Sequence, residues 1–152
     1  MTQVQPTPVT TQRVKRMLDD LELQYGVTQN NNFILPYYTH VALLSRGPDK
    51  EAPVWSVQSH WARKLDISYM SEAKNELQRQ AATEFAPKLI LGVSDDGMIE
   101  FLTFWSFNWT PLATDEQMSE EFRFVMNSLS RTYRTLDEAF LDPWSQEGHE
   151  IQ

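Results

Sequence analysis

An Asp-Gly turn between two apolar runs constrains the fold of this chain more than any other stretch of its sequence. Residues 88 to 94 and residues 98 to 107 are rich in β-forming side chains, and Asp95-Asp96-Gly97 joins them. Glycine accepts positive φ and aspartate tolerates it, so Asp-Gly between such runs is typical of a tight β-hairpin. We therefore predict a hairpin at the centre of an antiparallel sheet.

Three other stretches have the spacing of apolar residues that predicts amphipathic helices. The first covers residues 11 to 24 and ends at Gly26, where the chain can leave a helix easily. The second covers about residues 69 to 85, before Pro87. The third begins at a capping box formed by Thr114 and Gln117, runs past Phe140 and ends at Asp142-Pro143.

Shorter runs between the first two helices predict strands at residues 33 to 37, 40 to 46 and 54 to 61, and residues 25 to 28 are a further, shorter candidate. Helices separated from runs of antiparallel strands indicate an α+β fold. We predict an antiparallel sheet of about five strands with helices packed mainly on one face, in the order α-β-β-β-α-β-β-α. The expected division is a flexible tail over residues 1 to 10, one domain over residues 11 to 142, and a C-terminal tail over residues 143 to 152.

Composition excludes several classes of protein. A chain of 152 residues has the size of one domain, and the absence of cysteine excludes disulfides and thiolate chemistry. The net charge of −8 opposes binding to nucleic-acid phosphates. The N-terminus lacks the apolar core of a secretory signal, and no run is long enough for a membrane helix. We expect a cytoplasmic protein that binds neither nucleic acid nor membrane.

No group of residues has the pattern of a catalytic or cofactor site. The histidines His40, His60 and His149 are not part of a nucleophile or metal motif, and Asp95-Asp96-Gly97 lacks the ligand spacing of a calcium loop. The glycines form no phosphate-binding loop. Acidic clusters on the first and third helices are typical of solvated faces. We predict a protein that is not an enzyme and has no metal or cofactor.

Several segments together resemble the bacterial YbjN family, whose members are described as regulators of sensory transduction without an established biochemical activity. These segments are RVKRMLDDLELQY at 13 to 25, FILPY at 33 to 37, PVWSVQSHW at 53 to 61, NELQRQAATEFAPKLILGVSDDGMIEF at 75 to 101 and DEQMSEEFRFVMNSLSRTYRTLDEAF at 115 to 140. The resemblance covers residues 11 to 142 and implies a fold like that of type III secretion chaperones, which often dimerise and bind other proteins. Gln78, Arg79 and Gln80 depart from the Asn-rich, aromatic pattern of many family members.

The second strand of the hairpin is apolar on both faces, whereas a sheet with one face in water should alternate. Either both faces are covered, or one face stays open until a partner or a second copy of the chain covers it. The candidate binding surface comprises seven aromatic residues: Trp55, Trp61, Phe101, Phe104, Trp105, Phe107 and Trp109. The favoured function is a protein-binding module, with a homodimer as one form. The alternative is a small-molecule or peptide sensor with a pocket between the third helix and the sheet, lined by Trp55, Trp61, Phe101 and Trp105.

Overall fold

Six antiparallel strands form a single sheet with the strand order β1-β2-β3-β4-β6-β5. The structure is a computed structural model that describes residues 5 to 49, 53 to 83 and 87 to 141. The strands are β1 (Gly26–Val27), β2 (Phe33–Pro36), β3 (His40–Arg46), β4 (Trp55–Trp61), β5 (Leu89–Val93) and β6 (Ile99–Ser106). The predicted hairpin is confirmed, and β6 lies between β4 and β5. The sheet is one strand larger than expected because the two-residue β1 pairs with β2.

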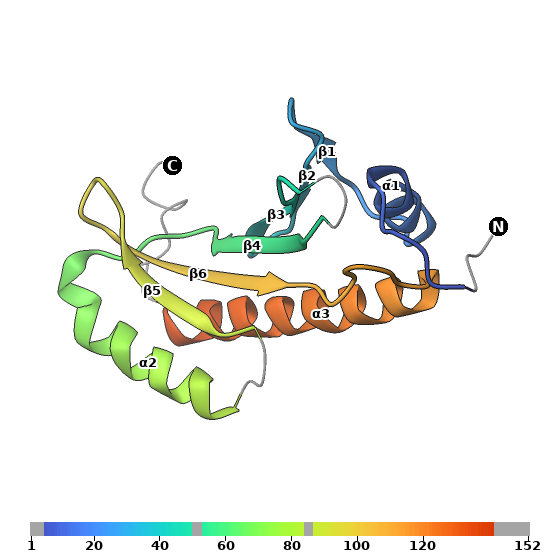
Figure 1. The fold of residues 1–152 in the computed structure, drawn as a ribbon. Coiled ribbons are helices and arrows are strands. Elements are labelled where there is room, and N and C mark those ends of the chain that lie inside the picture. The colour runs from blue at the N-terminus through green and yellow to red at the C-terminus, as the bar shows by residue number, and fades with distance from the viewer. Residues whose placement is uncertain (1–4, 50–52, 84–86, 142–152) are drawn as a thin grey trace.

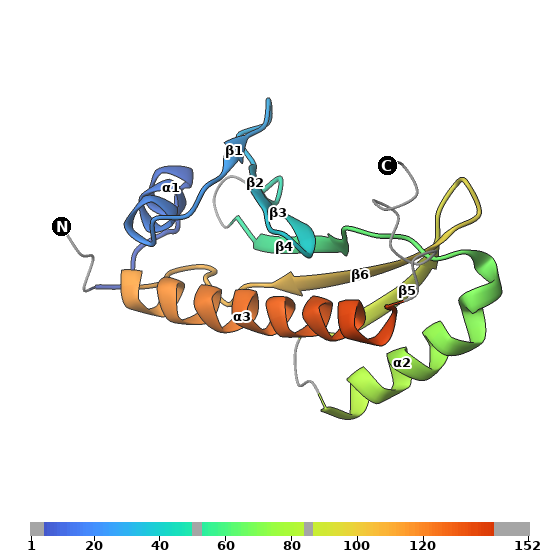
Figure 2. The same ribbon diagram turned by 180° about the vertical axis from the view of Figure 1, so that it is seen from behind.

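Three α-helices pack on this sheet: α1 (Thr11–Asp20), α2 (Met70–Thr83) and α3 (Asp115–Ala139). A short 3₁₀ helix, η1 (Ile67–Tyr69), precedes α2. Figures 1 and 2 show α3 running along β6, with α1 near its N-terminal end and α2 near its C-terminal end. The capping box predicted at Thr114 and Gln117 is present at the start of α3. None of the described helices is long and apolar enough to cross a membrane.

The helices cover one face of the sheet. Buried residues alternate with exposed or half-buried residues along β2, β3, β4 and β6, as expected when a single face packs on the core. The core side carries Phe33, Leu44, Trp55 and Phe101, which pack with the apolar stripes of α1 and α3. The predicted α+β architecture, with helices mainly on one face, is therefore confirmed.

Helix α1 is shorter than its apolar spacing predicts. It ends at Asp20 because Glu22 adopts a left-handed conformation with φ of 58°. The backbone N–H of Leu23 then donates to Leu18 O at 3.1 Å, which is the six-to-one bond of a Schellman motif. This motif turns the chain toward β1 several residues before Gly26.

The segment before α1 is attached to the domain. Thr7 forms an isolated antiparallel bridge with Ala113, and Val9 is buried in the core. Thr7 and Val9 therefore attach this segment to the domain that was predicted to begin at residue 11. Helix α3 ends at Ala139, before the predicted stop at Asp142-Pro143. The predicted tail residues 1 to 4, the helix end at Phe85, the pair Asp142-Pro143 and the tail from 143 to 152 lie outside the described residues.

Candidate functional site

Five of the seven aromatic residues predicted to form a binding surface lie in the hydrophobic core. These five, each almost completely buried, are Trp55, Trp61, Phe101, Phe107 and Trp109. The indole N–H groups of two of them are occupied, since Trp55 Nε1 donates to Val9 O at 3.0 Å and Trp61 Nε1 donates to Asp137 Oδ1 at 2.8 Å. Their burial explains how a chain of this size fills the space between the sheet and α3.

The remaining two residues lie on opposite faces of β6. Trp105 is half buried on the helix side, where its Nε1 donates to Glu121 Oε2 at 3.0 Å. Phe104 points to the other side and is 52% exposed. The seven residues therefore do not form one surface, and Phe104 belongs to a different group of side chains.

That group covers the sheet face opposite the helices, which we call the open face. The strand register aligns two apolar rows across it. One row contains Ile34, Leu43, Gln58 and Phe104, and the next contains Pro36, Val41, His60, Leu102 and Ile90. A row formed by Ser45, Ser56 and Ser106 borders them on one side, and Glu100 with Gly92 borders them on the other.

The open face is poor in charge, although 22% of the chain's residues are charged. In the rows just described, the single carboxylate is Glu100, which is half buried, and Lys and Arg are absent. Ile34 and Ile90 are 40% and 49% exposed, and Phe104 lies between them in the strand order. An exposed face with apolar side chains and few charges has the composition of a protein-binding interface.

Sequence reasoning missed Ile34, Leu43 and Ile90. Their strands, FILP, HVALLSR and LILGV, are apolar at consecutive positions, as is the second hairpin strand. Applying the same criterion to these strands identifies the rest of the open face. What identifies these strands is that they carry more apolar residues than are needed to fill the one sheet face that the helices cover.

Polar groups gather inside the core as well. Ser59 Oγ contacts Thr103 Oγ1 and lies 2.8 Å from the hydroxyl of Tyr133. His40 stacks between Tyr37 and Tyr133, with ring centroids 4.6 Å and 4.7 Å away. The pKa of His40 is lowered to about 4, mainly by burial and to a lesser extent by the nearby His60. Burial raises the pKa of Tyr133 to about 12. Both groups are therefore neutral at physiological pH.

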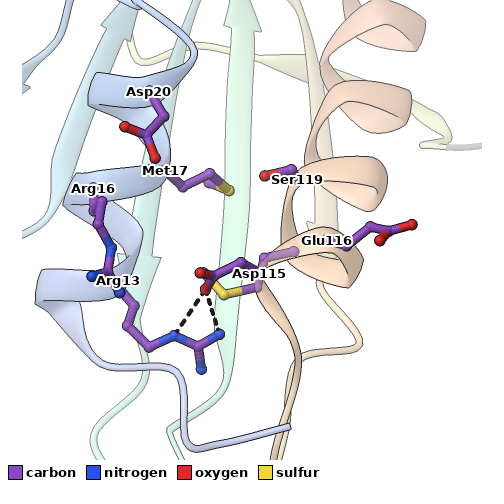
Figure 3. A pocket seen from close by; sticks show the side chains of 8 residues that line it. Arg13, Arg16, Met17, Asp20, Asp115, Glu116 and Ser119 are labelled. Carbon is purple, nitrogen blue, oxygen red and sulfur yellow. Dashed lines mark hydrogen bonds and ion pairs between the residues drawn. The ribbon is translucent and has the colours of Figure 1, made fainter. Parts of the chain in front are cut away.

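A polar cavity of about 290 Å³ lies between α1 and the start of α3 (Figure 3). Its main charges, Arg13 and Asp115, pair with each other, and Arg13 also donates to the backbone oxygens of Thr7 and Ala113. Arg16, Asp20 and Glu116 line the cavity too. Because the buried arginine already uses its donors within the chain, its arrangement fits a structural role.

A smaller cavity of about 200 Å³ is lined mainly by apolar groups from the end of α1, the β2–β3 loop and the middle of α3. Its lining residues are Leu21, Leu23, Tyr37, Phe122, Arg123, Met126, Asn127 and Ser130. The pocket predicted between α3 and the sheet was to be lined by Trp55, Trp61, Phe101 and Trp105, and none of these lines this cavity. Among the described residues, no cluster of three His, Asp and Glu side chains is placed to hold a metal ion.

These observations define an α+β protein in which three helices cover one side of an antiparallel sheet and no described helix covers the other, largely apolar side. Comparison with solved structures identifies the same fold in YbjN from E. coli, which is described as a proposed transcription regulator. The TM-score is 0.63 at 17% sequence identity, over 85% of this chain and 92% of that chain. No family model and no curated protein matches the sequence. The chain thus has the YbjN fold, as its sequence segments predicted.

Proposed function

We propose that this chain is a regulatory protein without catalytic activity, which acts by binding another protein through the open face of its sheet. The observation that carries the proposal is the pair of apolar rows containing Ile34, Leu43, Phe104, Leu102 and Ile90 on a face that no described helix covers. Burying such a face yields about 25 cal/mol for each Å² of apolar surface. A partner with an apolar strip of its own is the natural occupant.

The placement of the polar groups supports a binding role over an enzymatic one. His40 and Tyr133, whose pKa values are shifted most, lie in the core and line none of the cavities described above. A catalytic acid or base has to reach its substrate within hydrogen-bonding distance. The net charge of −8 also favours a protein partner over nucleic acid.

Site-specific photo-crosslinking tests this proposal. A benzophenone amino acid replaces Phe104 on the open face or, as a matched control, Phe124 on the outer surface of α3, since these two phenylalanines are 52% and 50% exposed. We expect a discrete protein adduct from position 104 in cells of the source organism, and none of the same mass from position 124. The variant Ile34→Lys, on the same row as Phe104, should abolish this adduct while the thermal unfolding of the protein stays the same.

An adduct of two copies of the chain also supports the proposal, because the partner is then the protein itself. Identical adducts from positions 104 and 124, or an adduct that Ile34→Lys leaves intact, would show that the open face is not the binding surface. The absence of any adduct at position 104 would contradict the proposal as well.

The second candidate function is a sensor of a small molecule, and the cavity of about 200 Å³ favours it. Sites for drug-sized ligands are usually about 300–1,000 Å³, so this cavity suits a small apolar ligand. Arg123 at its edge favours a carboxylate on that ligand. Benzoate should then raise the melting temperature of the protein, but not that of Met126→Trp, which fills the cavity; equal effects on both proteins rule this function out.

A further inference from the structure

Strand β5 forms one edge of the sheet, and the backbone groups of three of its five residues point away from β6. Ser94 N–H donates to Met98 O at 2.8 Å, which places Ser94 in a hydrogen-bonded pair of the β5–β6 ladder. Because such pairs alternate along an antiparallel ladder, Ile90 and Gly92 also face β6, while Leu89, Leu91 and Val93 direct their backbone N–H and C=O groups outward. No hydrogen bond between described residues uses these outward groups.

The sequence of β5 lacks the charged residues and the proline that often protect an edge strand. Strand β5 reads LILGV, with no charge and no proline, and none of its residues is fully buried. Ile90 and Val93 are 49% and 56% exposed on opposite sides of the strand. Natural proteins block such edges with Lys, Pro, bulges or covering segments, because an unprotected apolar edge pairs readily with another strand. Figure 1 shows β5 at the margin of the sheet, alongside α2.

We propose that a second copy of this chain pairs with β5 in antiparallel orientation, across a two-fold axis at Leu91. An antiparallel pair of strands is itself two-fold symmetric. A strand can therefore pair with the same strand of a second copy when the two-fold axis passes beside a residue whose backbone groups face outward. In this register Leu91 pairs with Leu91 of the second copy, and Leu89 pairs with Val93 of the second copy. Each pair forms two backbone hydrogen bonds, and the two sheets become one continuous sheet.

The side chains of β5 are complementary in this register. Ile90 lies opposite Gly92 of the second copy, and glycine leaves room for its side chain. Within one copy, Leu102 Cδ1 lies 3.2 Å from where a Cβ of Gly92 would be, so the glycine already permits close packing on the same face.

Charge complementarity also favours a second copy. Lys88 falls opposite Ser94 of the second copy, beside the turn that carries Asp95 and Asp96, and all three charged side chains are at least partly exposed. Each copy carries a net charge of −8, so a close contact requires a region such as β5 that has no charge of its own and basic groups placed against acidic ones.

This inference rests on the proposed protein-binding function and deepens it by naming a partner and a contact. Ile90, Leu102 and Phe104 lie on the open face near β5, so pairing at β5 brings the apolar rows of two copies side by side. The dimer would present an open face twice as wide as that of one copy.

Sedimentation velocity over the micromolar range tests the pairing. We expect the wild-type protein to show a reversible monomer–dimer equilibrium. Leu91→Pro removes an outward N–H that the β5–β6 ladder does not use, so it should weaken the dimer about tenfold or more while the chain still folds. Leu91→Ala is the matched control, since it shortens the same side chain and keeps the N–H.

A charge exchange tests the register and does not depend on proline. Lys88→Asp should weaken the dimer by placing three carboxylates together, and adding Asp95→Lys to it should restore the dimer. A wild-type protein that stays monomeric over the whole concentration range overturns the inference. The inference is also overturned if the Leu91→Pro dimer is as stable as the Leu91→Ala dimer. Failure of the double exchange to restore the dimer rejects the register.

The two proposals fail separately. If the open face binds a different protein, the Phe104 adduct persists in Leu91→Pro even though the dimer is lost. If Ile34→Lys abolishes self-association and Leu91→Pro does not, the copies meet through their open faces and the pairing at β5 is wrong.

Discussion

The guanidinium of Arg13 pairs with the carboxylate of Asp115 at 2.7 Å, across 102 positions of the sequence. Arg13 is 8% exposed, and its guanidinium also donates to Thr7 O at 2.8 Å, Pro8 O at 3.1 Å and Ala113 O at 2.9 Å. Asp115 belongs to the first turn of α3, where a negative charge also complements the helix dipole. One side chain therefore joins α1, the segment before it and the start of α3 (Figure 3).

Arg13→Ala should destabilise the fold strongly. The substitution leaves the Asp115 carboxylate and three carbonyl oxygens without their charged donor, and we expect a loss of about 2–4 kcal/mol in the free energy of unfolding, measured in urea. Lys15→Ala is the control, since Lys15 pairs with Asp19 on the exposed side of the same helix and should change little. Equal losses for the two variants would contradict the structural role of Arg13.

Sequence patterns predicted the elements of this fold well and its long-range contacts poorly. The hairpin and the start of α3 are specified by local chemistry, by Gly97 with φ of 80° and by the Thr114 capping box. Arg13, in contrast, belongs to a basic cluster that is typical of a solvated face. Its partner is a residue 102 positions away, and a contact of that kind leaves no trace in local spacing.

The surface that we propose for binding could be found from the sequence only indirectly, for a related reason. The apolar residues on both sides of β6 indicated that one side of the strand carries apolar surface beyond what the core requires. The aromatic content alone did not show which side that is. Tryptophans such as Trp55 and Trp61 fill the core because their large surface stabilises it most. The open face uses smaller aliphatic residues that strand alternation, combined with the register, brings together.

Stability should fall as the pH decreases from about 6.5 toward 4. The lowered pKa of His40, about 4 against an ordinary value of 6.5, means that the unfolded chain binds a proton at a higher pH than the folded one. This stabilisation is complete above pH 6.5 and is lost as the pH falls to the folded pKa. The loss is about 3 kcal/mol at most, measured as the free energy of unfolding in urea at each pH.

The variant His40→Phe should remove this pH dependence between pH 6.5 and 4. Phenylalanine keeps the stacking against Tyr37 and Tyr133 and cannot take up a proton. It also removes His40 Nε2, a buried atom without a hydrogen-bond partner. His60→Gln, on the open face, is the control and should retain most of the dependence, because burial is the larger cause of the lowered pKa of His40 and His60 is the smaller one. An unchanged pH profile in His40→Phe would show that other groups cause it.

Glu22→Gly should stabilise the protein. Glu22 holds a φ of 58° at the position after α1 where glycine is usual, and a side chain there costs about 1 kcal/mol relative to glycine. After the greater entropy of glycine in the unfolded chain is subtracted, we expect a gain of about 0.5 kcal/mol, seen as a higher melting temperature. Gln24→Gly is the control outside the motif and should lower the melting temperature or leave it the same. A lower melting temperature in Glu22→Gly would mean that the Schellman motif does not determine the end of α1.

Asp137→Ala should loosen the C-terminal half of α3 from the sheet. The Asp137 carboxylate accepts from Trp61 Nε1 at 2.8 Å and pairs with Arg63 at 2.7 Å, and the Arg63 guanidinium lies 5.3 Å from the Trp61 ring. Removing the carboxylate leaves a buried indole N–H without a partner, so we expect a loss of about 2–3 kcal/mol in the free energy of unfolding.

Asp137→Asn keeps an acceptor for Trp61 but not the ion pair, and should cost about half as much. Glu138→Ala, at the exposed neighbouring position, should change little. If Asp137→Asn were as costly as Asp137→Ala, the ion pair with Arg63 would be the dominant interaction, and the hydrogen bond from Trp61 would contribute little.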